Sequence, residues 1–319
     1  MQSISCLETR WVAVKRAAGA GALPLALFAT LALAADARVP YVPTPQGVVE
    51  RMLEIAKVGP GDYVIDLGSG DGRIVITAAK RHGARGFGVD LNPDRIKESN
   101  ENARRAGVTD KVAFYQRNLF ETDLAQASVI TMYLLPRVNL DLRPKLLELA
   151  PGTRLVSHDF DMGDWRADTH IAVRDEDKYG GAGGTSDIYF WVVPASVAGT
   201  WHWQAPVAGK PQSYEIRLDQ KYQVITGSVW IGGRTATLQG VSLRGSEIRF
   251  HFTAEVNGSP VTHEFSGKIE SDAINGTAAI SGPRVQARVE WNAMRGPRPA
   301  ASGVDAPAHA ARSSGGALN

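Results

Sequence analysis

The sequence predicts a doubly wound α/β sheet, followed by an antiparallel all-β barrel or sandwich. Over residues 39–194, short apolar runs alternate with longer amphipathic segments, which is typical of βαβ units with a parallel sheet. Over residues 195–294, apolar and polar residues alternate with a period of two between turn residues, which indicates antiparallel strands. Right-handed crossovers in the first region would place its ligand site at the carboxyl ends of the parallel strands.

The first region opens with apolar residues at helical spacing after Pro45, and Gly59-Pro60-Gly61 ends that helix. A later helix has Asn92 as its N-cap and Gly107 after its last residue. We expect helices at 45–58, 74–82, 93–106 and 137–149, and strands at 63–67, 86–89, 112–115, 128–133, 153–157, 170–173 and 188–193. The last two strands would form an antiparallel pair, joined by a glycine-rich loop.

The second region carries period-two runs that we expect to be strands at 214–218, 224–231, 235–238, 248–252, 261–269, 274–280 and 285–291. Its tryptophans are Trp201, Trp203, Trp230 and Trp291, and we expect them to fill the core. The alternative is a pocket for a lipid or a peptide, since small antiparallel barrels can enclose one ligand.

The composition excludes some classes of function. The chain has 35 basic and 33 acidic residues, and this near balance argues against nucleic acid as a partner. Cys6 is the only cysteine, so internal disulfides and cysteine-based metal sites are excluded. No spacing of histidine, aspartate and glutamate resembles a metal site, and we therefore expect no metal.

Residues 1–37 have the pattern of a signal peptide or a membrane anchor. Three basic residues, the last of which is Arg16, precede the uncharged run 17–35. An uncleaved anchor would associate the chain with a membrane. Either form places the rest of the chain in the periplasm or at the outer face of the inner membrane, whereas a misassigned start would leave it in the cytoplasm. Residues 295–319, rich in Ala, Gly, Ser and Pro, are expected to be a disordered tail.

The strongest functional signal is the run VIDLGSGDGR at 64–73, a glycine-rich turn between the first strand and the next helix. Gly68, Gly70 and Gly72 allow the backbone to turn tightly and to approach a ligand closely. The following helix offers free N–H groups at its N-terminus. Asp71 beside the last glycine favours a cationic ligand over the pyrophosphate of a dinucleotide, whose fingerprint needs a different glycine spacing. A dinucleotide oxidoreductase is the less favoured alternative.

Asp90 closes the next strand, at the same edge of the expected sheet. A carboxylate at that position can accept hydrogen bonds from both hydroxyls of a ribose. The alternative is that Asp90 only caps the following helix, although Asn92 is better placed for that role. The glycine loop and Asp90 together predict a site for a positively charged nucleoside.

These residues resemble the S-adenosylmethionine (SAM)-dependent methyltransferases, and the resemblance covers residues 45–194. It implies a seven-strand Rossmann-like methyltransferase sheet with SAM as its cofactor. The cofactor-binding residues that it implies are Asp66, Leu67, Gly68, Ser69, Gly70, Asp71 and Gly72 for the methionine part, Asp90 and Leu91 for the ribose, and Asn118 and Leu119 for the adenine. Many members carry an aspartate where this chain has Asn118, whose amide can still bond the adenine edge.

Three segments resemble a narrower group: YVPTP at 41–45, the glycine loop, and MYLLP at 132–136. This group includes bacterial methyltransferase-domain proteins and the mitochondrial protein-lysine methyltransferases of adenine nucleotide translocase and the ATP synthase c-subunit. The resemblance implies N-methylation of a protein lysine or another amine acceptor. The substrate-binding residues that we expect are Tyr41, Thr44, Tyr133 and Pro136. The chain lacks the Asn-Pro-Pro-Tyr motif at 132–136, which argues against a nucleobase amine as acceptor.

Two residues are candidates for catalysis. Tyr133 would orient the acceptor amine or contact the sulfonium, and His158, at the end of the fifth strand, would accept a proton from the acceptor. The alternatives are a tyrosine packed at the end of the sheet and a histidine that is hydrogen-bonded within its own turn. The rival function is an exported, non-catalytic protein that binds SAM or another ligand with a degenerate methyltransferase fold.

Overall fold

The computed structural model describes residues 41–296, except Asp177, Ala182 and Ala208. The expected signal peptide or anchor at 1–37 lies outside these residues, as does the expected tail beyond Gly296. Within the described ranges, no helix combines the length and the apolar character that a membrane crossing requires.

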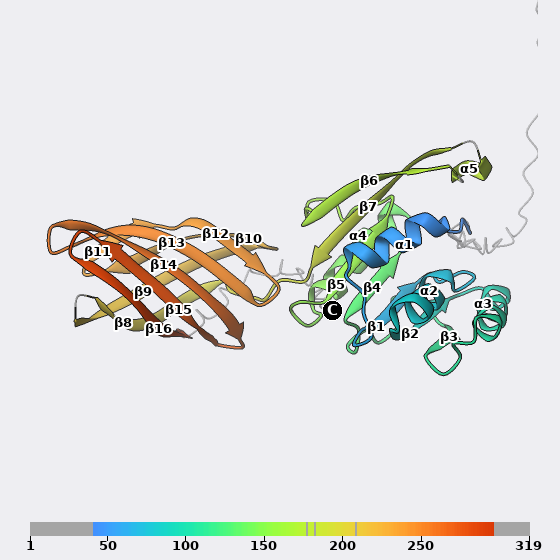
Figure 1. The fold of residues 1–319 in the computed structure, drawn as a ribbon, viewed down its shortest axis with the longest axis horizontal. Helices are drawn as coiled ribbons and strands as arrows, with labels where there is room; N and C mark the ends of the chain where they lie inside the picture. Colours follow the sequence, from blue (N-terminus) through green and yellow to red (C-terminus); the bar gives the residue numbers. More distant parts are fainter. Residues whose placement is uncertain (1–40, 177, 182, 208, 297–319) are drawn as a thin grey trace, which may run out of the picture. The chain divides into compact units, whose positions relative to one another are not determined.

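The first region folds into one seven-stranded sheet with the order β3-β2-β1-β4-β5-β7-β6 (Figure 1). Strands β1 to β5 are parallel to one another, and β7 runs antiparallel to both of its neighbours. The strands are β1 (Tyr63–Leu67), β2 (Arg85–Asp90), β3 (Val112–Gln116), β4 (Val129–Met132), β5 (Arg154–His158), β6 (Thr169–Asp175) and β7 (Gly184–Val192). The predicted doubly wound sheet is therefore confirmed, including its final antiparallel pair.

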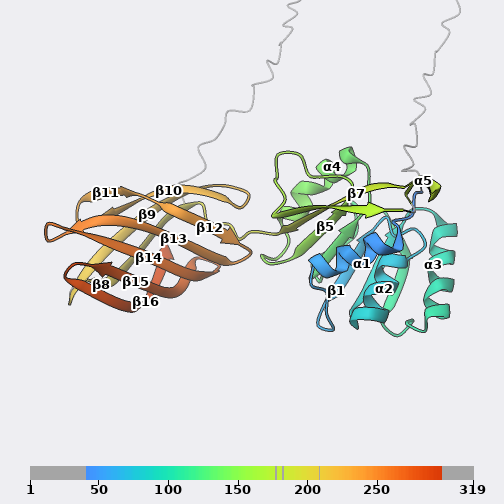
Figure 2. The same ribbon diagram turned by 45° about the horizontal axis from the view of Figure 1, so that its top comes forward.

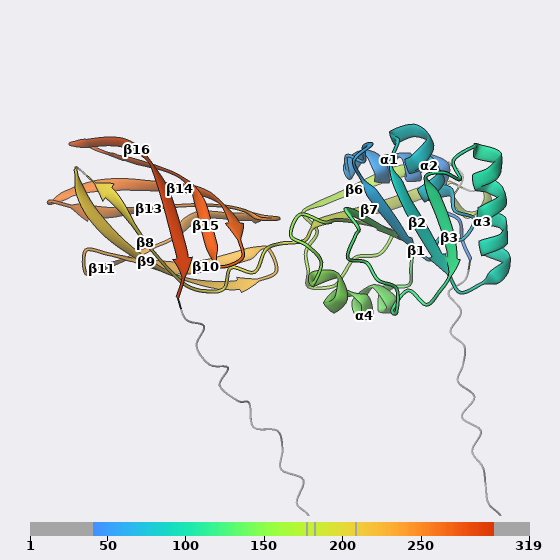
Figure 3. The ribbon, with the colours of Figure 1, turned by 90° about the horizontal axis from the view of Figure 1, so that it is seen from below.

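Helices cover both faces of this sheet. They are α1 (Gln46–Ile55), α2 (Arg73–His82), α3 (Pro93–Ala106) and α4 (Pro136–Leu147). Figure 3 shows α1, α2 and α3 on one face and α4 on the other. Val49 of α1 packs in one apolar cluster with Val156 of β5, whereas Leu142 of α4 packs in another with Leu155. Successive residues of β5 thus serve opposite faces, as the pleat of a strand requires.

The first helix is shorter than the sequence suggests. It ends at Ile55 rather than at residue 58, and Lys57 beyond it has a left-handed φ of 51°. That conformation cannot continue an α-helix. A further short helix, α5 (Lys178–Gly181), occupies part of the glycine-rich loop expected between the last two strands.

The β6–β7 hairpin extends past the carboxyl end of β5. His158, the last residue of β5, pairs with Ile188 of β7, whereas the pairing of β6 with β7 continues to Asp175 and Gly184. The tip of the hairpin, with α5, therefore projects beyond the edge of the sheet at which the ligand site is expected.

The second region is a nine-stranded antiparallel sheet with the order β11-β10-β9-β8-β16-β15-β14-β13-β12. Consecutive strands pair except β11 and β12, which are the two edges, and β8, the first, also pairs with β16, the last. Figures 1 and 2 show that it curls into a nearly closed barrel. The strands are β8 (Gly199–Val207), β9 (Lys210–Lys221), β10 (Val224–Ile231), β11 (Arg234–Thr237), β12 (Gln239–Arg244), β13 (Glu247–Val256), β14 (Ser259–Glu270), β15 (Ala273–Gly282) and β16 (Val285–Arg295). Strands β8 and β12 are not among the predicted strands, because they contain Pro206 and Gly240, residues that weaken a strand pattern.

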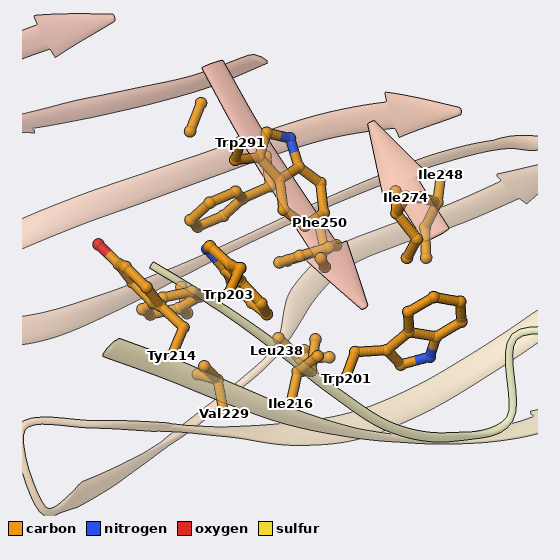
Figure 4. Close-up of a cluster of buried hydrophobic side chains, with 14 of the residues drawn as sticks. Trp201, Trp203, Tyr214, Ile216, Val229, Leu238, Ile248, Phe250, Ile274 and Trp291 are labelled. Atoms are coloured by element: carbon orange, nitrogen blue, oxygen red, sulfur yellow. The ribbon is translucent and has the colours of Figure 1, made fainter. Parts of the chain in front are cut away.

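The barrel core is rich in aromatic side chains (Figure 4). Trp201, Trp203 and Trp291 are between 0% and 5% exposed, as expected. The expectation for Trp230 is wrong, because this residue is 39% exposed. It alternates along β10 with Val229 and Ile231, both of which point into the core.

Replacement of a buried and of an exposed tryptophan should lower the free energy of unfolding by different amounts. We expect Trp201→Ala to lower the free energy of unfolding by about 3–5 kcal/mol, because it removes a large buried side chain and leaves a cavity. Trp230→Ala is the matched control and should cost less than about 1 kcal/mol. Urea unfolding followed by circular dichroism measures both, and equal losses would contradict the placement of Trp201 in the core.

Candidate active site

A tight glycine turn follows β1. Gly68, Gly70 and Gly72 have φ values of 78°, 52° and 82°, in the left-handed region that other residues rarely adopt. A Cβ atom at Gly70 would lie 2.5 Å from the ring of Tyr41, and one at Gly72 would lie 2.6 Å from the ring of Phe114. Larger residues at these two positions would therefore collide with neighbouring rings. Helix α2 begins directly after Gly72, and its first N–H, that of Arg73, donates to Oδ1 of Asp71 at 3.2 Å.

Asp66 lies on β1, immediately before this turn. It is 2% exposed, and its Oδ1 accepts a hydrogen bond of 2.7 Å from the hydroxyl of Thr131 on β4. Burial raises the pKa of Asp66 to about 7, against the opposing effect of the Thr131 bond, and the charges of Asp71 and Asp90 add to the rise. The carboxyl group of Asp66 therefore titrates near neutral pH.

Asp90, at the end of β2, joins the glycine turn to the neighbouring strand. Its Oδ2 accepts the N–H of Gly70 at 3.0 Å, and its Oδ1 accepts the N–H of Asn92 at 2.8 Å. Asn92 caps α3 by accepting the N–H of Asp94 at 2.9 Å. Asp90 is therefore not the cap of this helix, and its partly exposed carboxylate lies beside the turn.

The segment before α1 is fixed to the same loop. Arg73 forms a salt bridge of 2.6 Å with Asp71 and donates a hydrogen bond of 2.9 Å to the carbonyl of Thr44. The Arg95 guanidinium lies 4.4 Å from the centroid of the Tyr41 ring, within cation–π distance. Burial tends to raise the pKa of Asp71, but the hydrogen bonds and charge of Arg73 outweigh it and lower the pKa overall. Arg73 thus offsets the negative charge of Asp71.

Asn118 and Leu119 follow β3 at the same edge of the sheet. The Oδ1 of Asn118 accepts the N–H of Phe120 at 3.1 Å, and its Nδ2 donates to Glu121 at 3.1 Å. The amide thus stabilises its own turn in this structure. Leu119 is partly buried, and Leu91 after β2 is 65% exposed. The residues expected around a nucleoside all follow neighbouring strand ends, and their individual roles stay predictions.

His158 is buried at the end of β5, with 1% exposure. Its Nδ1 lies 3.2 Å from the hydroxyl of Thr44, and its Nε2 lies 2.9 Å from the hydroxyl of Ser186. Burial lowers the pKa of His158 to about 4, so the ring is neutral at pH 7. The ring of Tyr133 packs against it, with 3.9 Å between the ring centroids.

Asp159 completes this group, although the sequence analysis does not single it out. Its Oδ2 accepts a hydrogen bond of 3.2 Å from the Tyr133 hydroxyl. Its Oδ1 accepts bonds from the ammonium of Lys178 at 2.8 Å and from the N–H of Asp187 at 3.0 Å. Its φ of 61° is unusual for a residue other than glycine. Burial acts to raise the pKa of Asp159, but Lys178 and the other donors hold it below the usual value.

Leu134 connects this group to the glycine turn. It follows Tyr133 in the chain, is 3% exposed, and lies so close to Gly68 that a Cβ atom there would be 2.8 Å from its side chain. Pro136 is exposed at the first position of α4. Across the described residues, no three histidine, cysteine, aspartate or glutamate side chains gather closely enough to hold a metal ion.

The raised pKa of Asp66 gives a testable dependence of stability on pH. A pKa that rises from 3.8 to about 7 on folding contributes stability that is complete below pH 4 and is lost as the pH rises through 7. Asp66→Asn keeps an acceptor for Thr131 but removes the titration. Relative to the unmodified chain, this variant should therefore gain up to about 1.4 kcal/mol per pH unit between pH 4 and 7.

Urea unfolding at several pH values measures this difference. Asp110→Asn is the matched control, because Asp110 is an exposed aspartate outside the sheet and its turn. If the unfolding free energies of Asp66→Asn and the unmodified chain stayed parallel from pH 4 to 7, the Asp66 pKa would not be raised.

Known proteins are similar in sequence to the first region of this chain, which carries the glycine turn. Residues 66–169 match the family described as the ANTKMT methyltransferase domain. A protein-lysine N-methyltransferase of Saccharolobus islandicus (strain REY15A) is 52% identical over 139 residues, which are 43% of this chain and 86% of that relative. The adenine nucleotide translocase lysine N-methyltransferase of Mus musculus is 35% identical over 161 residues, 48% of this chain and 69% of the relative.

A crystal structure of an RNA methyltransferase from Salinibacter ruber, in complex with S-adenosyl-L-homocysteine, is 51% identical in sequence. It covers 49% of this chain and 96% of its own, with a TM-score of 0.45.

The family match spans the glycine turn, Asp90, and the group around Tyr133 and His158. Identity of 52% over 86% of a relative's length is far above what unrelated sequences share. The chain is therefore a methyltransferase that uses SAM, and it belongs to the family that includes these protein-lysine N-methyltransferases.

Proposed function

We propose that the chain methylates the side-chain amine of a lysine in a protein. One observation carries this proposal: the Tyr133 hydroxyl and the Asp159 carboxylate form a hydrogen-bonded pair next to the glycine turn at 68–72, which we now call the cofactor turn. A carboxylate and a hydroxyl suit the ammonium or amine of lysine. The printed names of the two curated relatives, both lysine N-methyltransferases, support the same class of acceptor.

The residues of the glycine turn fit SAM. Three glycines leave room for close approach, the positive end of the α2 dipole lies directly after the turn, and Asp90 presents a partly exposed carboxylate. The Ser69 hydroxyl is buried in the turn and has no hydrogen-bond partner among the described residues. SAM supplies a methyl group that is already strongly electrophilic on a cationic sulfur. In this proposal, Asp90 holds the ribose, and the turn around Ser69 holds the methionine part.

Catalysis in this proposal depends mainly on positioning. Tyr133 and Asp159 would hold the acceptor nitrogen, and fixing two reactants in line supplies much of the rate. The pKa of Asp159 is lowered, so this carboxylate is suited to bind an ammonium rather than to take its proton. His158 is buried with hydrogen bonds at both ring nitrogens, which supports a role in positioning Tyr133 instead of contact with the acceptor. The proton of the amine would then leave to water.

The site of action is a separate proposal. The basic and apolar pattern of residues 1–37 supports export, and we propose that the chain acts in the periplasm or on the outer face of the inner membrane. The acceptor would then be a protein of the cell envelope. Fractionation of cells that express the full chain checks this, and recovery of all the protein in the cytosol would contradict it.

Loss of the Asp90 carboxylate should abolish cofactor binding. We expect Asp90→Ala to weaken SAM binding by about a hundredfold or more, because it removes the ribose acceptor and the bond to Gly70. Titration calorimetry of the purified chain with SAM measures the affinity, and Asp110→Asn is the control that should bind normally. No binding by the unmodified chain at millimolar SAM would defeat the proposed function.

Removal of the Tyr133 hydroxyl should slow methyl transfer without weakening the binding of SAM. We expect Tyr133→Phe to lower kcat by about tenfold while SAM affinity stays unchanged, because the hydroxyl acts on the acceptor. Transfer of labelled methyl from SAM into a cell-envelope extract, with mass spectrometry of the labelled residues, measures the rate and identifies the acceptor. Tyr63→Phe is the matched control, at the opposite end of the sheet. Label on residues other than lysine would refute the lysine assignment.

A further inference from the structure

We propose that Lys178 is an internal methyl acceptor, so that the chain methylates itself at this residue. The inference rests on the proposed function, because it needs a site that accepts lysine. The Nζ of Lys178 lies 2.8 Å from Oδ1 of Asp159, whose other oxygen accepts the Tyr133 hydroxyl. The amine of Lys178 is therefore already bound to Asp159, the carboxylate that is proposed to hold the acceptor nitrogen.

The burial of Lys178 distinguishes it from the other lysines that the structure describes. It is 9% exposed, and it is the one described lysine that is buried. Lysines are rarely buried, because the ammonium loses its hydration and needs hydrogen-bonded partners. Lys178 finds such partners in Asp159 and in the carbonyl of Thr185. Its amine is thus held between Asp159 and the backbone of the β6–β7 hairpin.

The topology places the Lys178 amine at the edge of the sheet that carries the glycine turn. The β6–β7 hairpin projects past His158 at the carboxyl end of β5, and Lys178 follows β6 at its tip. A continuous line of contacts leads back to the cofactor turn. Lys178 bonds to Asp159, Asp159 bonds to Tyr133, and the next residue, Leu134, packs on Gly68.

The transfer step is the same as for an external lysine. The Nζ of Lys178 must first lose a proton, which goes to water, so that its lone pair is available. This lone pair forms the new bond to the methyl carbon of SAM while the carbon–sulfur bond breaks. S-adenosyl-L-homocysteine leaves as a neutral thioether, and the methylated amine carries the positive charge. No oxidant, reductant or further reactant is needed.

The alternative is that the salt bridge between Lys178 and Asp159 only stabilises the β6–β7 hairpin, and that no methyl group is transferred to Lys178. Such a structural bridge would leave Lys178 unmodified in an active enzyme. The two readings therefore differ in one measurable quantity, the amount of methyl group on Lys178.

The test uses the full chain, analysed as purified and again after incubation with labelled SAM. Peptide mass spectrometry should find methyl groups on Lys178 and far less on Lys145, another lysine whose amine is fixed by two carbonyl groups. Lys178→Arg keeps a cation beside Asp159 and should abolish the label. Lys145→Arg is the matched control and should leave the label on Lys178 unchanged.

A mixing experiment tests whether the acceptor is internal. The unmodified chain, whose cofactor and acceptor sites are both intact, is combined with ¹⁵N-labelled Asp90→Ala, which keeps Lys178 but should not bind SAM and whose peptides differ in mass. We expect no label on the Asp90→Ala chain, because each Lys178 is held within its own molecule. The labelled fraction per unit time should also stay the same over a hundredfold dilution. Label on the Asp90→Ala chain would overturn the internal assignment.

The outcomes separate this inference from the proposed function. Label on lysines of envelope proteins without label on Lys178 would overturn the inference and leave the function in place. Binding of SAM with no label on any lysine would defeat both. Label on Lys178 that Lys178→Arg removes would support both the inference and the assignment of Asp159 to the acceptor nitrogen.

Discussion

The hydrogen bond from the Gly70 amide to the Asp90 carboxylate holds the cofactor turn against the neighbouring strand. The turn itself contains three glycines in left-handed conformations, and such residues lose much conformational freedom on folding. A carboxylate from β2 fixes the middle glycine, and the adjacent Asn92 then starts α3. The positions of two strands, two helices and the turn are thereby linked through one side chain. Contacts within the fold thus fix the geometry of the turn.

Three carboxyl groups lie at this edge of the sheet, and each has a different electrostatic state. Burial keeps the pKa of Asp66 near 7, so this group is only partly charged at neutral pH. The charge of Asp71 is offset by Arg73. Asp71 and Asp90 are both partly exposed, and Asp90 accepts the N–H groups of Gly70 and Asn92. Three full negative charges so close together would repel one another strongly. Asp90 is thus the partly exposed carboxylate of this edge that Arg73 does not neutralise.

The sequence predicts the local parts of this site better than the distant ones. The glycine turn and Asp90 can be identified because strand, turn and helix follow one another along the chain. The pairing of Asp159 with Lys178 cannot be read in this way, since it depends on how far the β6–β7 hairpin extends past β5. The placement of His158 between Thr44 and Ser186 likewise needs three segments that are distant in the sequence. In the barrel, the error at Trp230 came from residue type, whereas the alternation along β10 indicates the outward face.

The first and last strands of the barrel, β8 and β16, pair with each other. Trp201 of β8 pairs with Arg295 of β16, and the Gly296 N–H donates to the Thr200 carbonyl at 2.7 Å. A short linker could therefore join these two points, and new termini could be opened at a hairpin such as Asn257-Gly258, with every strand pair kept. A domain whose two ends meet in this way can be inserted at a single point of a host chain without forcing the host's two halves apart.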